Sequence, residues 1–285
     1  MAGCTLPAAL PTQTLTVTPE PSQTITATHP STATSEPAST PYINSPTPTL
    51  IPIQKVGQLT IVTYQMKEPP YIEPLMFSSV QGRKFGSEDF SLGDVRFPDR
   101  SFFDDTQHYC MQNNLDGSHL VACQGFSTDG KVGWVKLTQN GKEIYYTDTG
   151  DPSSINTLEG LWVYDHHWVL ETVHVSIHNS GTETEIEDAG QITVDGTRLN
   201  TQKNYDEAFS FQTIAGKPFF LFKREGKLGF SYNSEETLLD LYDSVPHYGC
   251  CSAAALNPQA WEDHINFFGQ QDENWYFVTI GILKP

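Results

Sequence analysis

Four Asp-Gly or Asn-Gly dipeptides in the middle of the chain constrain its fold more than any other feature. They are Asp116-Gly117, Asp129-Gly130, Asn140-Gly141 and Asp195-Gly196. Both residues of such a pair readily adopt a positive φ, which a two-residue β-hairpin turn requires. The first three dipeptides lie 13 and 11 residues apart. This spacing predicts a four-stranded antiparallel meander with strands at about 107–115, 118–128, 131–139 and 142–148.

Residues 207–240 predict a second meander, with turns at Ala215-Gly216, Glu225-Gly226 and near Asn233-Ser234. Two-residue turns fix the register of the strands that they join. The expected cross-strand pairs are Phe209 with Phe222, Phe211 with Phe220, Leu221 with Phe230 and Phe219 with Tyr232. Both faces of this sheet would be apolar, so it should lie between other layers, as a blade does in a propeller.

Two further β units are expected, at 157–203 and from 244 to the end. The last has clear strands only at about 263–268 and 274–282, and the run at 58–66 could supply its missing strand. The sequence allows either a fifth blade or an irregular insertion at residues 67–103. The predicted fold is therefore an all-β, propeller-like domain of about five blades over 57–285, with a β-sandwich as the alternative.

The region before this domain has the composition of a disordered stalk. Thr, Ser and Pro fill 27 of the 46 positions from 5 to 50, and only Glu20 and Glu36 carry charge. So few large apolar groups cannot offset the entropy lost on ordering. We therefore predict a Thr/Ser/Pro-rich stalk over 5–56, preceded by a separate short segment at 1–4.

Four of the five cysteines, all but Cys4, lie in the predicted domain. A hairpin turn at 116–117 places Cys110 opposite Cys123 at a non-hydrogen-bonded position, where the Cα separation is about 4.5 Å and permits a disulfide. Two buried thiols are the alternative at these positions. Cys250 and Cys251 are adjacent, so a bridge between them would be strained. That vicinal bridge, free thiols and cross-pairing with the first two cysteines all stay open.

The charge balance excludes one class of partner. The 285-residue chain has a formal net charge of −18. An acidic surface repels phosphate groups, so we expect neither nucleic-acid binding nor adhesion to anionic lipid headgroups.

No motif in the sequence specifies an enzyme, a metal site or a cofactor. The segment at 165–178 contains Asp165, His166, His167, His174 and His178. On a strand, however, residues four apart stand about 13 Å from each other and cannot share one zinc ion. We therefore expect no catalytic residue, no metal and no cofactor. Asp148, Asp151, Glu187 and Asp188 are the loop carboxylates that a glycan hydrolase could use.

The candidate binding residues lie in two segments that we expect to be loops, at 165–168 and 247–252. Both combine polar side chains with aromatic ones or with the adjacent cysteines. The candidates are Asp165, His166, His167, Trp168, His247, Tyr248, Cys250 and Cys251.

Two resemblances add to this picture. Ala2-Gly3-Cys4 resembles the end of a bacterial lipoprotein signal, which implies that Cys4 is acylated, that the protein is extracytoplasmic and that the lipid is its only membrane contact. The succession of meanders resembles TolB/WD40-like propeller repeats. The Gly-Lys-apolar-Gly-aromatic element shared by DGKVGWVKLTQN (129–140) and EGKLGFSYNSEE (225–236) resembles WG-type repeats. Such propellers mostly bind partners.

The function that these features favour is non-catalytic binding. We expect a surface-anchored lipoprotein whose domain binds an extracellular ligand or protein. A glycan- or cell-envelope-acting hydrolase that uses loop carboxylates is one alternative, and a purely structural module is the other.

Overall fold

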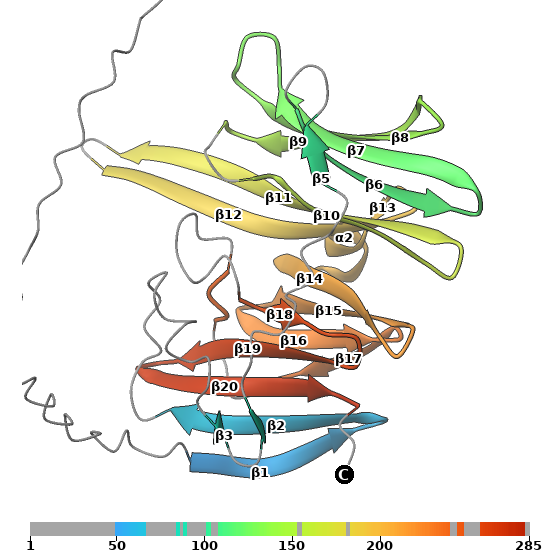
Figure 1. Cartoon of the computed structure of the whole chain (residues 1–285). Coiled ribbons are helices and arrows are strands. Elements are labelled where there is room, and N and C mark those ends of the chain that lie inside the picture. The colour runs from blue at the N-terminus through green and yellow to red at the C-terminus, as the bar shows by residue number, and fades with distance from the viewer. Residues whose placement is uncertain are drawn as a thin grey trace, which may run out of the picture. The chain divides into compact units, whose positions relative to one another are not determined.

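The structure is a computed structural model that describes residues 49–66, 84–85, 88–89, 101–103, 108–152, 156–180, 183–239, 244–247 and 257–282. Within these ranges the fold is all-β, as predicted, and consists of antiparallel sheets with one short helix (Figure 1). Cys4, Tyr248, Cys250, Cys251 and most of the predicted stalk lie outside the described residues.

The largest sheet has nine strands and curls into a half-barrel. Its strands are β5 (Ser101–Phe103), β6 (Tyr109–Leu115), β7 (Ser118–Phe126), β8 (Gly133–Gln139), β9 (Lys142–Gly150), β10 (Leu158–Tyr164), β11 (His167–Ser180), β12 (Glu183–Val194) and β13 (Thr197–Arg198). The helix α2 (Leu199–Lys203) follows β13. Strands β6 to β9 form the first predicted meander with its predicted turns, which confirms that part of the sequence analysis.

The curl brings β10 back toward β6. The Nδ2 atom of Asn113 on β6 donates a hydrogen bond to the carbonyl oxygen of Leu161 on β10, at 3.1 Å. Buried apolar side chains fill the inside of the curl, because strands on opposite walls turn alternate residues toward it. They include Met111, Leu120, Val135, Leu137, Leu158, Leu161, Trp168 and Leu170.

A four-stranded sheet and a five-stranded sheet complete the main core. The four-stranded sheet runs in the order β14 (Glu207–Ile214), β15 (Lys217–Arg224), β16 (Lys227–Tyr232), β17 (Glu235–Leu238). The five-stranded sheet runs β1 (Thr49–Val56), β2 (Leu59–Met66), β20 (Asn274–Gly281), β19 (His264–Gln271), β18 (Gln259–Ala260). Two short strands, β3 (Lys84–Phe85) and β4 (Glu88–Asp89), pair with each other.

The four-stranded sheet is buried on both faces, as predicted (Figure 1). Phe211 and Phe220 pack against Val169 and Ile192 of the half-barrel. On the opposite face, residues such as Phe219 and Phe230 pack with residues of the five-stranded sheet that include Phe267 and Val278. The prediction that the run at 58–66 joins the final strands is also confirmed, since β2 pairs with β20 along its length.

A propeller of about five blades is not confirmed. The strands predicted for two separate blades, at about 107–148 and 157–203, belong to the one nine-stranded sheet. Its two parts join where Gly150 of β9 pairs with Val175 of β11 in parallel. Turn dipeptides specify hairpins but not the contacts between hairpins, and so this junction was not predicted.

Two local predictions are wrong. Phe209 lies opposite Leu221, not Phe222, because a β-bulge at Ser210 and Phe211 shifts the register of β14 by one residue. The pairs that join β15 to β16 are as predicted. The predicted stalk also extends too far, since 49–56 form β1, where Ile51 and Val56 pack against the core.

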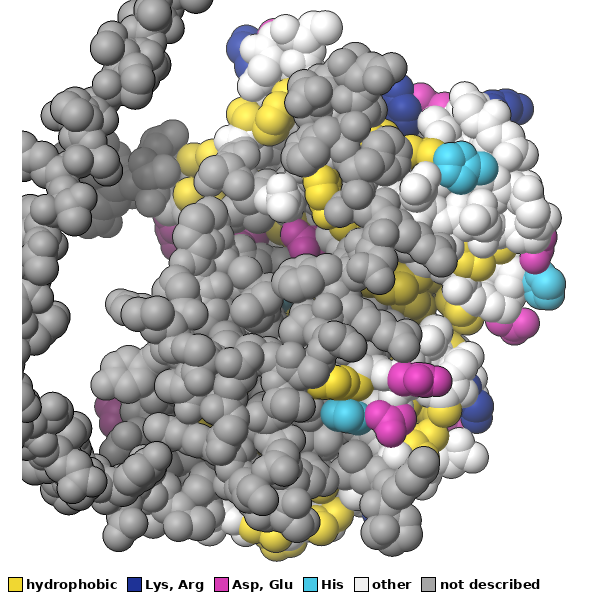
Figure 2. All heavy atoms as spheres, viewed as in Figure 1, with side chains coloured by type: hydrophobic (Ala, Val, Ile, Leu, Met, Phe, Trp, Pro, Cys, Tyr) yellow, Lys and Arg dark blue, Asp and Glu magenta, His cyan; other side chains and the backbone are white. Residues whose placement is uncertain are grey.

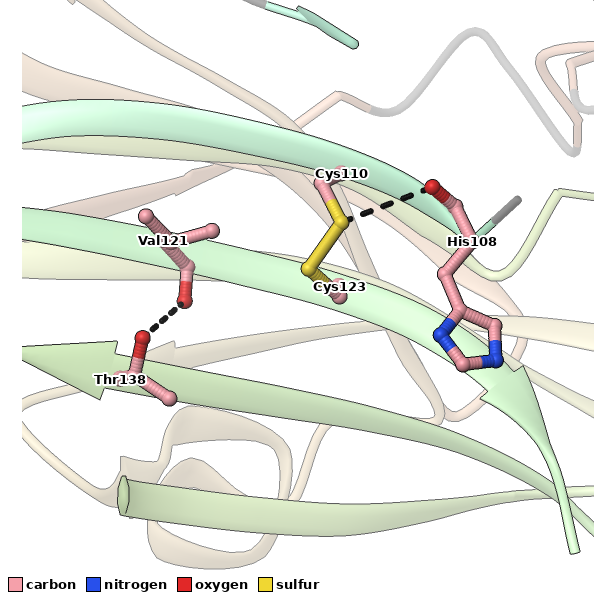
Figure 3. The surroundings of a disulfide bond; sticks show 5 residues. All are labelled: His108, Cys110, Val121, Cys123 and Thr138. Carbon is pink, nitrogen blue, oxygen red and sulfur yellow. Dashed lines mark hydrogen bonds between the residues drawn. A yellow bond between two sulfur atoms is a disulfide. The ribbon is translucent and has the colours of Figure 1, made fainter. Parts of the chain in front are cut away.

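A disulfide joins Cys110 to Cys123 across β6 and β7, as predicted (Figure 3). The two Cα atoms are 4.1 Å apart, and Cys110 is fully buried. On the neighbouring strand β8, the Oγ1 atom of Thr138 donates a hydrogen bond to the carbonyl oxygen of Val121, at 3.3 Å. The disulfide therefore connects β6 to β7, and the Thr138 hydrogen bond connects β7 to β8.

Replacing Cys110 and Cys123 together with Ala is expected to lower the free energy of unfolding by about 3 kcal/mol. The bond closes a loop of sequence separation 13, and its loss restores entropy to the unfolded chain. Urea unfolding with and without a thiol reductant measures the effect. Reductant should destabilise the wild-type protein and leave the double variant unchanged; equal stability of the two proteins without reductant would contradict the expectation.

Candidate functional site

A pocket of about 370 Å³ lies between the half-barrel and the four-stranded sheet. One wall comes from the β10–β11 and β12–β13 hairpins with α2. The other comes from Tyr205 before β14, from β14 and β15, and from the β16–β17 hairpin that carries Ser234 and Glu236. Apolar and polar side chains both contribute to the lining. The lining residues are Tyr164, His167, Val194, Asp195, Thr197, Leu199, Gln202, Lys203, Tyr205, Phe211, Pro218, Phe220, Ser231, Ser234 and Glu236.

Aromatic rings form the apolar part of the pocket. The ring of Tyr164 lies 5.7 Å from that of Phe211 and 5.6 Å from that of His167, measured between ring centroids. Behind them, Trp162 packs on Phe211 at 5.5 Å. The indole of Trp162 covers Gly160, where a Cβ atom would come within 1.6 Å of the ring, so only glycine allows this packing.

Two tight turns position the polar atoms on the half-barrel side. Asp165 and His166 have φ values of 42° and 64°, so they form a two-residue turn that brings Tyr164 opposite His167. Asp195, in the β12–β13 turn, reaches this hairpin. Its Oδ2 atom lies 2.5 Å from His167 Nδ1, and its Oδ1 atom accepts a hydrogen bond from the Trp168 backbone N–H at 3.1 Å.

A charged network stands on the opposite side of the pocket around Glu236. The Tyr205 hydroxyl donates to Oε1 of Glu236 at 2.8 Å, and Arg224 donates to Oε2 at 2.6 Å. Lys203 lies 3.5 Å from the same carboxylate. Burial alone would favour the neutral acid, but the hydrogen bonds from Tyr205 and Arg224 outweigh it and lower the pKa of Glu236. Glu236 is therefore a carboxylate at neutral pH.

The predicted segment at 165–168 contributes one residue to the pocket lining, His167. Asp165 and His166 occupy the exposed turn, where His166 Nδ1 lies 2.8 Å from Asp116 Oδ1. Trp168 points into the half-barrel, is 8% exposed and packs against Tyr145. Successive residues of a strand face opposite sides, which is why His167 and Trp168 separate.

In the other predicted segment, His247 has a side chain that is 10% exposed and does not line this pocket. Its Nε2 atom lies 2.9 Å from Glu207 Oε1, and its ring stacks on Phe209 with a centroid distance of 3.8 Å. Burial of Glu207 favours the neutral acid, but the hydrogen bond and charge of His247 outweigh that effect and lower the pKa of Glu207. Glu207 also accepts a hydrogen bond from the Gly190 N–H at 3.2 Å, so this carboxylate connects β14 both to His247 and to β12.

Of the four carboxylates predicted at loop tips, only Asp151 lies outside a strand, because Asp148 belongs to β9 and Glu187 and Asp188 belong to β12. Asp148 accepts a hydrogen bond from the Gly150 N–H at 2.6 Å, and Asp151 accepts one from the Ile177 N–H at 2.8 Å. Glu187 lies on the surface of β12, 3.6 Å from His178. His166, His167 and His178 therefore each lie beside a different acidic residue. No three His, Cys, Asp or Glu residues in the described ranges are placed to hold a metal ion.

Glu159 and Glu171 on adjacent strands were also missed by the sequence analysis; Glu171 is buried and Glu159 is partly buried. Glu159 occupies a bulge in β10 opposite β11, the strand that carries Glu171. The two oxygens of Glu171 accept hydrogen bonds from the backbone N–H groups of Ser210 and Phe211. Burial, together with the charge of Glu171, raises the pKa of Glu159 to about 8. The available signal was a single acidic residue within each of the apolar runs LEGLWVY and WVLETVHV.

No protein-family model matches the chain, and no curated protein matches it. Among the residues that the structure describes, none of the helical segments is long and apolar enough to span a membrane.

Proposed function

We propose that this protein is a surface-anchored lipoprotein whose β domain binds an extracellular ligand without catalysis. The pocket between the half-barrel and the four-stranded sheet carries the proposal, because it combines aromatic rings with a few converging polar groups. Ala2-Gly3-Cys4 and the Thr/Ser/Pro-rich stretch support acylation at Cys4 and an extracytoplasmic location. Binding in this pocket requires only the contact between two sheets, so a ring of blades is not needed.

The protonation and bonding of the pocket acids favour binding over catalysis. A general acid needs a raised pKa, whereas that of Glu236 is lowered. Asp195 already accepts a hydrogen bond from Trp168 N–H and lies beside His167. Among the described residues on the face seen in Figure 2, Lys and Arg side chains form no broad patch, which supports a ligand other than nucleic acid.

The test is ligand binding to the full chain and to a pocket variant, Tyr164→Ala. We expect at least one compound in a panel of glycans, peptidoglycan fragments and peptides to raise the melting temperature. At a hundred times the dissociation constant, a ligand adds about 2.7 kcal/mol of stability. Tyr164→Ala should weaken binding at least about tenfold, because it removes an aromatic contact.

Tyr146→Ala is the matched control, since Tyr146 is 52% exposed on β9 and does not line the pocket. It should bind as the wild-type protein does. A ligand whose affinity is unchanged by Tyr164→Ala would place binding elsewhere and overturn the proposed site.

Hydrolysis of a glycan or other envelope polymer is the second candidate. The observation that favours it is the position of Glu159 in the β10 bulge, next to the Gly160 that pairs with Glu171 on β11. Burial and the charge of Glu171 raise the pKa of Glu159 to about 8, and a raised pKa is what a general acid requires. Release of reducing ends from the glycans of the same panel, lost in Glu159→Gln, would establish this candidate over simple binding.

A further inference from the structure

The charges that line or adjoin the pocket are balanced within the protein. On one side Asp195 has His167 as its partner at 2.5 Å. On the other side Glu236 has two basic partners, Arg224 at 2.6 Å and Lys203 at 3.5 Å. An anionic ligand would be repelled by the acidic protein as a whole and by the Asp195 carboxylate. A cationic ligand would be repelled locally by Lys203 and Arg224. This balance disfavours ligands with a net charge.

One aromatic ring is available as a contact surface. Phe211, Phe220 and Tyr205 are at least nine-tenths buried, at 3%, 6% and 6% exposure, so they form the base on which the pocket rests. Tyr164 is only half-buried and lies at the lining. Burial and the nearby carboxylates of Asp195 and Asp165 raise the pKa of Tyr164, so its hydroxyl keeps its proton at neutral pH. Tyr164 thus offers an apolar face with a neutral polar tip.

The polar groups that line the same pocket as this ring can both donate and accept hydrogen bonds. Because the Nδ1 atom of His167 lies against Asp195, its Nε2 atom is the nitrogen left for a ligand. The Gln202 amide on α2 and the Ser234 hydroxyl line the same pocket and are exposed. Groups of this kind match hydroxyls, which also donate and accept.

We propose that the ligand is a neutral carbohydrate, bound as a mono- or disaccharide unit. The apolar face of a sugar ring would lie on Tyr164, and its hydroxyls would bond to His167 Nε2, Gln202 and Ser234. The pocket volume of about 370 Å³ is near the lower end for small-molecule sites, which run from about 300 to 1,000 Å³, and this limits the size of the unit. The inference rests on the proposed function and specifies the ligand class of the same pocket.

The experiment is isothermal titration calorimetry on the full chain with defined sugars. The neutral probes are cellobiose, maltose, lactose and N,N′-diacetylchitobiose, and the charged probes are glucuronic acid and glucosamine. A set of short neutral, acidic and basic peptides completes the panel. We expect at least one neutral disaccharide to bind, and neither charged sugar to bind more tightly.

Two pocket variants locate the sugar, each with a matched control. Tyr164→Ala should weaken binding at least about tenfold, and Gln202→Ala about fivefold, because each removes a direct contact. Tyr146→Ala and Gln54→Ala make the same chemical changes on exposed strands outside the pocket and should leave the affinity unchanged. If Tyr164→Ala does not fold, Gln202→Ala alone decides, since Gln202 is exposed.

The outcomes separate this inference from the proposed function. Binding of only a charged sugar or a peptide, lost in the pocket variants, would overturn the carbohydrate inference and leave the proposed pocket standing. A neutral sugar that binds both pocket variants as well as the wild-type protein would overturn both. Failure of every neutral sugar at millimolar concentration would overturn the carbohydrate inference, and failure of the whole panel would also overturn the proposed function.

Discussion

Glu171→Ala is expected to lower the free energy of unfolding by about 4 kcal/mol. Glu171 is 3% exposed, and its Oε1 and Oε2 atoms accept hydrogen bonds from the backbone N–H groups of Ser210 and Phe211 at 2.7 and 2.9 Å. Each N–H left without an acceptor inside the protein costs about 1–3 kcal/mol, and bonds to a charged acceptor are the stronger ones. In Glu171→Ala, the two N–H groups of the β14 bulge would lose their hydrogen-bond acceptor.

Urea unfolding at neutral pH measures this loss. Glu171→Gln should have an intermediate effect, because the amide keeps one acceptor oxygen and presents a donor to the second N–H. Glu185→Ala removes an exposed glutamate from the adjacent strand β12 and should change stability by less than about 0.5 kcal/mol. A loss below about 1 kcal/mol in Glu171→Ala would show that the bulge does not depend on this carboxylate.

Glu159→Gln is expected to stabilise the protein at alkaline pH by roughly 3 to 5 kcal/mol. Burial, with the charge of Glu171, raises the pKa of Glu159 from 4.5 to about 8. The folded state therefore keeps a proton that the unfolded chain releases above pH 4.5. Stability is fully present below pH 4.5 and decreases as the pH rises to about 8, by about 1.4 kcal/mol for each unit between the two pKa values. Glutamine is always neutral and avoids this loss.

The measurement is urea unfolding of the wild-type protein and Glu159→Gln at pH 5, 7 and 8.5. The difference between the two proteins should grow with pH and level off above pH 8. Glu185→Gln is the control, because it removes an exposed carboxyl whose contribution should be constant over this range. A constant difference between wild type and Glu159→Gln would show that Glu159 is ionised in the folded protein at neutral pH.

Local rules predicted the hairpins of this fold well. A two-residue turn at Asp116-Gly117 fixes which residues oppose one another, and Cys110 indeed lies opposite Cys123. The same rule gave Phe219 opposite Tyr232. It failed in β14, where Ser210 has a φ of 56° and the register shifts. The partner that accommodates this bulge, Glu171, is 39 residues away, so no local pattern indicates it.

The pocket was only partly predictable for the same reason. The two histidines and the aspartate of 165–168 indicated a candidate site in this segment, and His167 does line the pocket. Its other wall comes from residues such as Tyr205 and Glu236, which a different sheet brings into place. Hairpin rules contain no information on how one sheet packs against another. The alternation of side chains along β11, visible in the sequence, would have separated His167 from the buried Trp168.

Under the proposed acylation of Cys4, the edge position of β1 would have a mechanical consequence. The eight residues of β1 pair only with β2 among the described strands, and most of their side chains are exposed. Tension along a tether attached at Cys4 would therefore act first on a strand that contributes little to the core. Detached and extended at roughly 3.3 Å per residue, β1 would lengthen the tether by about 26 Å. The β2–β20 pairing behind it would stay intact and protect the pocket from the load.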